Sequence, residues 1–253
     1  MNKPALQKGF LLTRQSYDYQ GKPQINLWLS TDKGPAKLIL SGEKPVFFIK
    51  QIDLPTVQSL LQNLNNNYSH KLLKLHTFSQ QSVAGIYFNS LRAFYDARAI
   101  LVQGDIEVFE SNIRLEDRYL MERFVYAGVE FMGEQSTLAE QARKGYIEYR
   151  NIKIKPCDYV PTLNILSLDI ECSEKGELYS IGFYTGKVKQ GNHSGFSKII
   201  MIQPEPLSEK EAAAEYIEWV INEVELLRAL EKTIQHIDPD IRGCSEFCVR
   251  LVV

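Results

Sequence analysis

The sequence lacks several features that would place it in a specialised class of protein. Its 253 residues contain no apolar run approaching 18 residues, the length that a membrane-spanning helix needs. The opening stretch MNKPALQKGF has no apolar core of the kind found in signal peptides. We therefore expect a cytoplasmic protein with no membrane partner.

Cysteine and histidine are scarce and scattered. Cys244 and Cys248 form the one close pair among four cysteines, and no second pair or histidine cluster accompanies them. A zinc site needs four such ligands at short spacings, so we expect free thiols. The four histidines also lack ligand spacing, and we interpret them as surface or core residues: His70, His76, His193 and His236.

The chain also lacks an overall basic charge. It has 29 Lys and Arg residues against 31 Asp and Glu residues, a formal net charge of −2. Binding of nucleic acid by the charge of the whole chain is therefore excluded, whereas a local basic groove is compatible with this balance. Hydrophobic residues make up 44% of the sequence, enough to build the core of one large domain or of two ordinary ones.

The apolar pattern predicts a β-rich first domain over residues 1–155. Three strand-like segments open it: KGFLLTRQSY, PQINLWLST and PAKLILSG. Residues 46–110 then alternate strand and helix in the order βαββαβ, which is the ferredoxin-like arrangement. The expected class is therefore mixed α/β, of the α+β type.

A second domain is expected over residues 156–253, after a boundary marked by two prolines. Three successive strands predict a β-meander at 163–170, 177–185 and 197–206, whereas residues 208–220 suit either a helix or a strand. The segment NEVELLRALEKTIQHI predicts a helix that begins after Asn222. Its apolar spacing places four residues on one expected buried face: Val224, Leu227, Leu230 and Ile234.

The tripeptide Asp-Ile-Glu occurs twice, at 105–107 and at 169–171. Residues two apart in a strand share a face, so Asp169 and Glu171 should project side by side at the end of an apolar strand. Two ionised carboxylates at such a short distance repel each other, and a hard divalent cation such as Mg²⁺ or Mn²⁺ removes the repulsion. Asp105 and Glu107 follow the helix-ending Gly104, and we interpret them as solvated residues at the rim of a sheet.

Three segments of the sequence resemble family B DNA polymerases. LSLDIECSEKGELYSIGF resembles the family's first exonuclease motif, EVELLRALEKTIQHIDPDI resembles the helix and Asp-Pro-Asp before the second motif, and DRYLMERF resembles the helix that joins the first two domains. The resemblance runs from about Gly9 to Ile241. It covers the N-terminal domain and the first part of an RNase H-like 3′–5′ exonuclease domain.

The resemblance implies a parent enzyme that is a DNA-directed DNA polymerase with proofreading, acting in DNA replication and repair, with DNA as its partner. Asp169 and Glu171 match the first two of the family's four catalytic, metal-binding acids. The implied cofactor is Mg²⁺ or Mn²⁺, and two such ions about 4 Å apart serve phosphodiester hydrolysis.

The resemblance stops after Ile241. The family continues with Asn-x-x-x-Phe-Asp, whereas this chain reads IRGCSEFCVRLVV. We interpret residues 242–253 as an aberrant tail produced by a frame change. If CSEF were encoded TGT AGT GAA TTT, the frame one base later would read Val-Val-Asn-Phe, which is similar to the NVVxFD of the family. We therefore expect an incomplete exonuclease domain with a weak or partial metal site, no polymerase activity and little or no exonuclease activity. The sheet edge should stay open, giving either a homodimer through that edge or a disordered tail.

A second hypothesis treats the chain as a non-enzymatic module that binds single-stranded nucleic acid. Aromatic residues of the βαββαβ unit alternate between faces, so some could stack on bases: Phe47, Phe48, Tyr87 and Phe88. Packing within the protein is the other use of these rings, and it is the interpretation we favour.

The joining helix has aromatic and basic residues of its own. We expect Tyr119, Leu120 and Phe124 to pack within the protein. We expect Arg118 and Arg123 to act as domain-interface partners, and we assign no residue to DNA contact.

Overall fold

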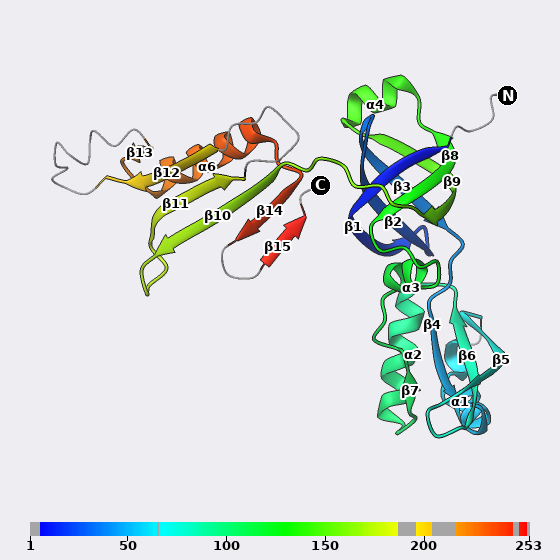
Figure 1. Cartoon of the computed structure of the whole chain (residues 1–253). Coiled ribbons are helices and arrows are strands. Elements are labelled where there is room, and N and C mark those ends of the chain that lie inside the picture. Colours follow the sequence, from blue (N-terminus) through cyan, green and yellow to red (C-terminus); the bar gives the residue numbers. More distant parts are fainter. Residues whose placement is uncertain (1–5, 65, 187–195, 204–215, 245–247, 252–253) are drawn as a thin grey trace. The chain divides into compact units, whose positions relative to one another are not determined.

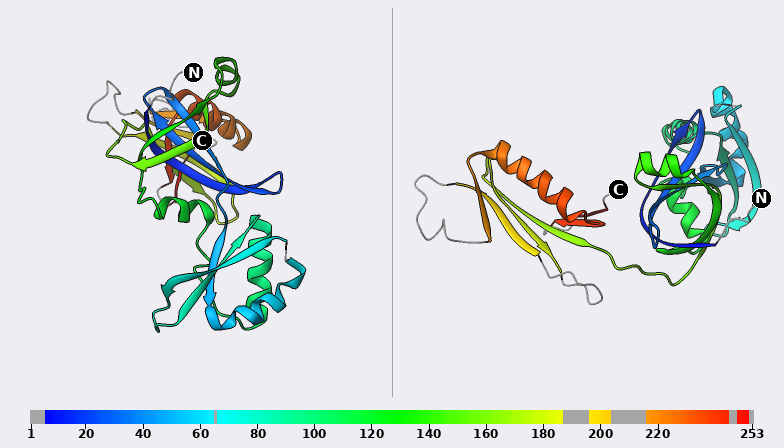
Figure 2. Two further views of the ribbon diagram at one scale, coloured as in Figure 1. Left: turned by 90° about the vertical axis from the view of Figure 1, so that its right-hand side faces the viewer. Right: turned by 90° about the horizontal axis from the view of Figure 1, so that it is seen from above.

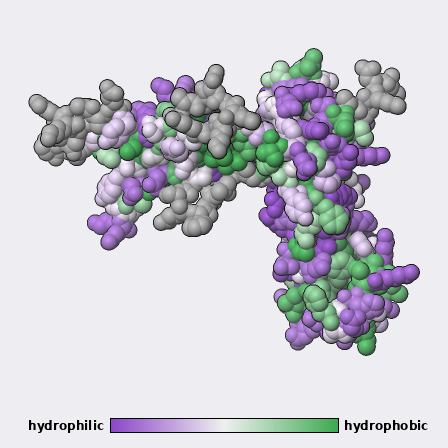
Figure 3. All heavy atoms as spheres, in the orientation of Figure 1, coloured by the Kyte–Doolittle hydropathy of each residue, from purple (hydrophilic) through white to green (hydrophobic). Residues whose placement is uncertain are grey.

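The computed structural model describes residues 6–64, 66–186, 196–203, 216–244 and 248–251. The chain divides into two compact units, Met1–Val160 (unit 1) and Pro161–Val253 (unit 2). Each unit has its own hydrophobic core, and the class is mixed α+β with a high content of strand. On the face drawn in Figure 3, hydrophilic and hydrophobic residues are interspersed over unit 1. Among the described residues, no helix combines the length and the apolar character that crossing a membrane requires.

Unit 1 contains a closed five-stranded barrel in the order β1-β2-β3-β9-β8 (Figure 1). The strands of the barrel and two short helices beside it are β1 (Gln7–Tyr19), β2 (Lys22–Thr31), β3 (Gly34–Ser41), β8 (Gly128–Gln135), β9 (Ile147–Pro156), α3 (Leu115–Met121) and α4 (Leu138–Lys144). Alternate residues of β2 point inward, and Ile25, Leu27 and Leu29 are fully buried. The three predicted opening strands are confirmed, whereas their closure with β8 and β9 into a barrel was not predicted.

The rest of unit 1 is a four-stranded antiparallel sheet in the order β5-β6-β4-β7 with helices on one face (Figure 2). Its elements are β4 (Val46–Lys50), α1 (Leu54–Leu60), β5 (Tyr68–His76), β6 (Ser82–Phe88), α2 (Leu91–Gln103) and β7 (Val108–Phe109). This is the element order expected for residues 46–110. Ser90 begins α2, and its hydroxyl accepts a hydrogen bond of 3.0 Å from the amide of Ala93. The core between sheet and helices includes Phe47 and Phe88, both fully buried.

Unit 2 is a six-stranded sheet in the order β13-β12-β11-β10-β14-β15, covered on one face by α6 (Figures 1 and 2). Its elements are β10 (Ile165–Cys172), β11 (Leu178–Thr185), β12 (Phe196–Ile202), β13 (Ile217–Val220), α6 (Glu223–Ile237), β14 (Ile241–Cys244) and β15 (Cys248–Leu251). The antiparallel meander β10-β11-β12 is as expected. Within the ambiguous segment, 217–220 is a strand and 208–215 lies outside the described residues.

The expectation of an open edge beside the first strand of unit 2 is wrong. β14 pairs with β10 in parallel, with Ile165 opposite Ile241 and Leu168 opposite Cys244. β15 then pairs antiparallel with β14. Residues 166–168 of β10 are therefore paired on both sides, and this half of β10 lies inside the sheet.

The predicted buried face of α6 is also wrong in part. Val224 and Leu227 are exposed, at 57% and 47%, whereas Leu226 is fully buried. The residues that pack on the sheet are Leu226, Ala229, Leu230, Ile234 and Ile237. Asn222 does begin the helix as expected, because its side-chain oxygen accepts a hydrogen bond of 3.0 Å from the amide of Glu225.

Candidate functional site

Asp169 and Glu171 lie near the end of β10, and the alternation of the strand determines where they point. Leu166 is fully buried in the core that β10 shares with α6, and Leu168 packs against the same core. Asp169 and Glu171 occupy the opposite face of the strand. Both carboxylates are exposed.

The neighbouring strand leaves space beside this pair. Asp169 lies opposite Gly182 of β11, and a Cβ atom added at Gly182 would lie 3.7 Å from the Cβ atom of Asp169. The register shifts directly after Glu171, so that Cys172 pairs with Leu178 and the ladder is irregular there. Irregularities of this kind redirect side chains and often lie next to active sites. Sequence reasoning missed Gly182, although an isolated glycine in a strand pattern is a signal to look for.

The pair fits part of a divalent-cation site. Two exposed carboxylates on one face of a strand provide the hard oxygen ligands that Mg²⁺ and Mn²⁺ prefer. In the part of the chain that the structure describes, no three His, Cys, Asp or Glu side chains come together in a metal-binding group. The described residues therefore supply two protein ligands, and water would have to complete an octahedral shell.

The first copy of the tripeptide has a different setting. Asp105 lies in the turn after α2 with a φ of 55°, and Glu107 precedes β7 in an irregular segment. The Glu107 carboxylate binds Nζ of Lys50 at 2.8 Å. The hydrogen bond and the charge of Glu107 raise the pKa of Lys50. A side chain of the protein thus already neutralises this carboxylate.

Helix α3 shows which of the predicted packing residues are buried. Tyr119 and Leu120 are buried, at 4% and 5% exposure, as expected. The same expectation is wrong for Phe124, which is 73% exposed. The helix ends at Met121, and Phe124 adopts a φ of 53°, so it no longer continues the helical face.

The two arginines near α3 join it to other elements of unit 1. Arg118 binds Glu110 at 2.8 Å, and its guanidinium lies 5.3 Å from the centre of the Phe48 ring. Arg123 binds Glu43 at 3.0 Å. Both arginines therefore have acidic partners within their own unit.

Comparisons with known proteins cover both units. The family model described as "DNA polymerase II, N-terminal" matches residues 9–43. DNA polymerase II of Escherichia coli (strain K12) is 32% identical over 235 residues, which cover 93% of this chain and 28% of that protein. The structure of the family B DNA polymerase from the hyperthermophilic archaeon Pyrobaculum calidifontis matches with a TM-score of 0.64 and 15% identity, covering 94% of this chain and 30% of that one.

The chain is therefore similar in sequence to part of a bacterial DNA polymerase II. Its fold matches that of part of a family B DNA polymerase. The chain spans 28% of the length of this curated relative.

Proposed function

We propose that these residues form the N-terminal domain and the first part of the 3′–5′ exonuclease domain of a DNA polymerase of the polymerase II type, which acts on DNA. In this proposal the sheet β5-β6-β4-β7 is ferredoxin-like, and the meander β10-β11-β12 with α6 belongs to an RNase H-like domain. The all-antiparallel pairing of the first sheet supports the first assignment. The antiparallel meander of the second sheet, with β14 parallel to β10, supports the second.

The observation that carries the proposal is the placement of Asp169 and Glu171 together on the exposed face of β10, opposite Gly182. Their task is to hold Mg²⁺ or Mn²⁺ at the end of the strand. A divalent ion supplies phosphodiester hydrolysis with a Lewis acid and an activated water. The glycine opposite Asp169 itself places no side-chain atoms beside the carboxylate.

We expect only weak ion binding by a polypeptide of residues 1–253, because two carboxylates leave most of an octahedral shell to water. For the same reason we expect little or no exonuclease activity, and no polymerase activity, from that polypeptide. A homodimer through an open edge beside β10 loses its structural basis along residues 165–168, because β14 pairs with β10 there.

The proposal is tested by titrating the 1–253 polypeptide with Mn²⁺ and measuring free Mn²⁺ by electron paramagnetic resonance. Asp169→Asn with Glu171→Gln should weaken binding at least about tenfold, because two anionic ligands become neutral. The matched control is Asp105→Asn with Glu107→Gln, which removes the same charges from the other copy of the tripeptide. It should leave the affinity unchanged.

Equal loss of Mn²⁺ affinity in the two double variants would contradict the proposal, because the effect would then follow net charge alone. Circular dichroism of all three proteins checks that the variants fold. In a parallel assay with a labelled single strand, cleavage that Asp169→Asn with Glu171→Gln abolishes would support the site and refute the expected inactivity.

A second candidate function is binding of single-stranded nucleic acid by the face of the four-stranded sheet that lies opposite α1 and α2. Phe47 and Phe88 are fully buried, whereas Phe48 and Tyr87 lie half-buried on the opposite face. The Tyr87 ring lies against Gly85, where an added Cβ atom would be 3.0 Å from it, and Nζ of Lys71 lies 5.2 Å from the ring centre. A partly exposed ring beside a cation is a setting in which bases stack.

For this candidate we expect a labelled single-stranded oligonucleotide to bind weakly. Tyr87→Ala should reduce the affinity by a factor of about 5 to 150, which corresponds to about 1–3 kcal/mol for one stacked base. Tyr95→Ala is the control, because Tyr95 is an exposed tyrosine on α2. Fluorescence anisotropy at low salt measures both. Unchanged affinity after Tyr87→Ala would eliminate the stacking role.

A further inference from the structure

The four-stranded sheet of unit 1 ends in an exposed strand with a free outer edge. β5 lies at the margin of this sheet (Figure 1), and among the described residues it pairs with β6 alone. Of its nine residues only Tyr68 and Leu73 are partly buried, and the others are exposed. Every second residue of an antiparallel strand points its N–H and C=O groups away from the neighbouring strand. The outer edge of β5 therefore offers backbone donors and acceptors to an added strand.

The two faces of β5 differ in character. Tyr68 packs against the core between the sheet and its helices. Leu72 lies on the same face by the alternation of the strand, and it is 59% exposed. Lys71 lies on the opposite face, where its Nζ is 5.2 Å from the centre of the Tyr87 ring. The strand thus presents an apolar side chain on one face and a cation on the other.

Further apolar side chains lie in solvent at the end of β5. Leu75 is half-exposed, and Phe78 in the following turn is fully exposed. Backbone hydrogen bonds fix this turn: the amide of Thr77 donates to the carbonyl of Gln81 at 2.9 Å, and the amide of Gln80 donates to the carbonyl of Thr77 at 2.9 Å. The Phe78 ring is therefore held in solvent by a defined turn. Aromatic side chains are frequent anchors of protein–protein interfaces.

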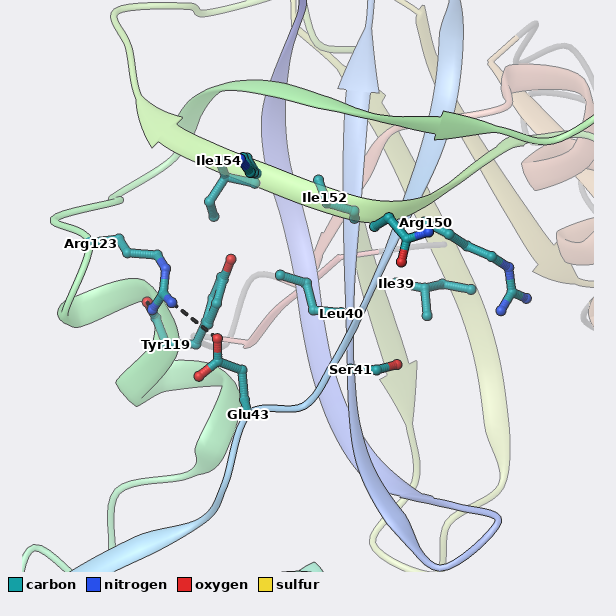
Figure 4. A pocket seen from close by; sticks show the side chains of 11 residues that line it. Ile39, Leu40, Ser41, Glu43, Tyr119, Arg123, Arg150, Ile152 and Ile154 are labelled. Carbon is teal, nitrogen blue, oxygen red and sulfur yellow. Dashed lines mark hydrogen bonds and ion pairs between the residues drawn. The ribbon is translucent and has the colours of Figure 1, made fainter. Parts of the chain in front are cut away.

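The exposed strand is also basic. Residues 54–95 contain no Asp or Glu, whereas Lys71 and Lys74 lie on β5. Neither lysine has an ion-pair partner among the described residues. The cavity in Figure 4 has a different setting, because its Arg123 is bound by Glu43 at 3.0 Å. The charge of β5 is thus left for a partner from outside.

The combination of a free edge, apolar side chains and unpaired lysines selects the kind of partner. A second copy of this chain fits poorly, because pairing two β5 strands brings their lysines together, and like charges across a strand pair are destabilising. A nucleic-acid strand has the complementary charge, but it has no row of amide groups to pair with the edge and leaves the leucines uncovered. An acidic polypeptide in an extended conformation satisfies all three features.

We propose that the outer edge of β5 binds an extended, acidic segment of another protein as an added strand. Backbone hydrogen bonds to β5 supply affinity in this mode of recognition, and alternate side chains supply specificity. Acidic side chains of the partner lie on the Lys71 face, and apolar side chains lie on the Leu72 face. This inference does not depend on the acidic pair of unit 2.

The test uses the 1–253 polypeptide and a fluorescent peptide as long as β5, in which glutamate alternates with valine. Fluorescence anisotropy at low salt should show binding of this peptide and no binding of a matched peptide with lysine in place of glutamate. Lys71→Glu with Lys74→Glu should weaken binding of the acidic peptide at least about tenfold and allow the lysine peptide to bind. Lys33→Glu with Lys175→Glu makes the same change of charge in exposed turns elsewhere, and it should alter neither affinity.

The apolar contact has its own matched pair of variants. Leu72→Ser should weaken binding of the acidic peptide several-fold, because it removes the apolar side chain from that face of β5. Leu138→Ser is the control, because Leu138 is 81% exposed on α4. Both positions are exposed, and circular dichroism checks that the variants fold.

Backbone pairing is tested with two N-methylated forms of the acidic peptide, one methylated at its odd positions and the other at its even positions. Only one set of amides in an added strand faces β5, so one form should lose binding and the other should retain it. Hydrogen exchange followed by mass spectrometry should show slower exchange of residues 68–76 when the unmodified peptide is bound.

Each of several results would overturn the inference. Absence of binding would remove the site, and equal weakening by the two lysine pairs would show that net charge alone attracts the peptide. Equal binding of the two N-methylated peptides would refute strand addition. A single-stranded oligonucleotide that displaces the peptide at the same concentration would assign the lysines to polyanions in general. Self-association of the polypeptide that Leu72→Ser abolishes would assign the edge to a second copy.

Discussion

At the scale of single residues, the two copies of Asp-Ile-Glu show that the same residue types have different settings in different parts of the fold. Glu107 is bound by Lys50, and Asp105 lies in a turn. Asp169 and Glu171 share one face of β10, and a glycine lies opposite Asp169. The sequence could predict the side-by-side carboxylates from the period of a strand. It could not show that Lys50, 57 positions away along the chain, lies next to Glu107, because that contact depends on how β4 and the segment before β7 come together.

The carboxyl group of Asp117 should make the free energy of unfolding of unit 1 depend on pH. Burial would raise its pKa, but hydrogen bonds from Arg14 and Arg114 outweigh it and hold the pKa below the usual range. A carboxyl whose folded pKa is lowered stabilises the protein above its unfolded pKa of about 4, and the stabilisation disappears as the pH falls through the folded pKa.

Asp117→Asn should therefore lower the free energy of unfolding of unit 1 by about 1.5 kcal/mol at pH 7. This value is the low end for a hydrogen bond to a charged group, and we choose it because the side chain is partly exposed. Near pH 3 the difference from the unsubstituted protein should shrink. Urea unfolding at the two pH values measures it. A difference that is the same at pH 7 and pH 3 would contradict the ion-pair explanation.

At the scale of elements, α6 shows that the spacing of apolar residues can predict a helix without predicting which of its faces is buried. Its sequence has apolar residues at 224, 226, 227, 229, 230, 234 and 237, which form a stripe too broad to locate its own centre. The sheet decides the orientation, because Leu226 and Leu230 reach the core around Leu166 and Ile200. The existence and the start of the helix could be predicted, but its rotation could not.

Two neighbouring leucines of α6 give a matched test of that orientation. Leu226→Ala should destabilise unit 2 by about 2–5 kcal/mol, because it leaves a cavity in a fully buried site. Leu227→Ala removes the same atoms from a residue that is 47% exposed, and it should cost much less. Chemical denaturation measures both. Comparable losses for the two variants would show that the helix faces the sheet differently.

At the scale of the whole molecule, the sequence predicts features that depend on neighbouring segments, but it does not predict pairing between distant strands. The βαββαβ order and the meander depend on neighbouring segments, and both could be predicted. The barrel depends on parallel contacts between β3 and β9, more than 100 positions apart, and β14 has only Ile-Arg-Gly-Cys to reveal it. Neither pairing leaves a periodic signal in the sequence, because register between distant strands is set when they meet.

The central claim, that Asp169 and Glu171 form the metal centre of an exonuclease-type domain, is tested most directly by nuclear magnetic resonance. Substoichiometric Mn²⁺ is added to the ¹⁵N-labelled 1–253 polypeptide, and broadening of the backbone amide signals locates the bound ion. We predict that residues 169–171 of β10 and the opposite residues 180–182 of β11 broaden first, and that Asp169→Asn with Glu171→Gln abolishes this selectivity. Preferential broadening at residues 105–107, or broadening without selectivity for any segment, would contradict the claim.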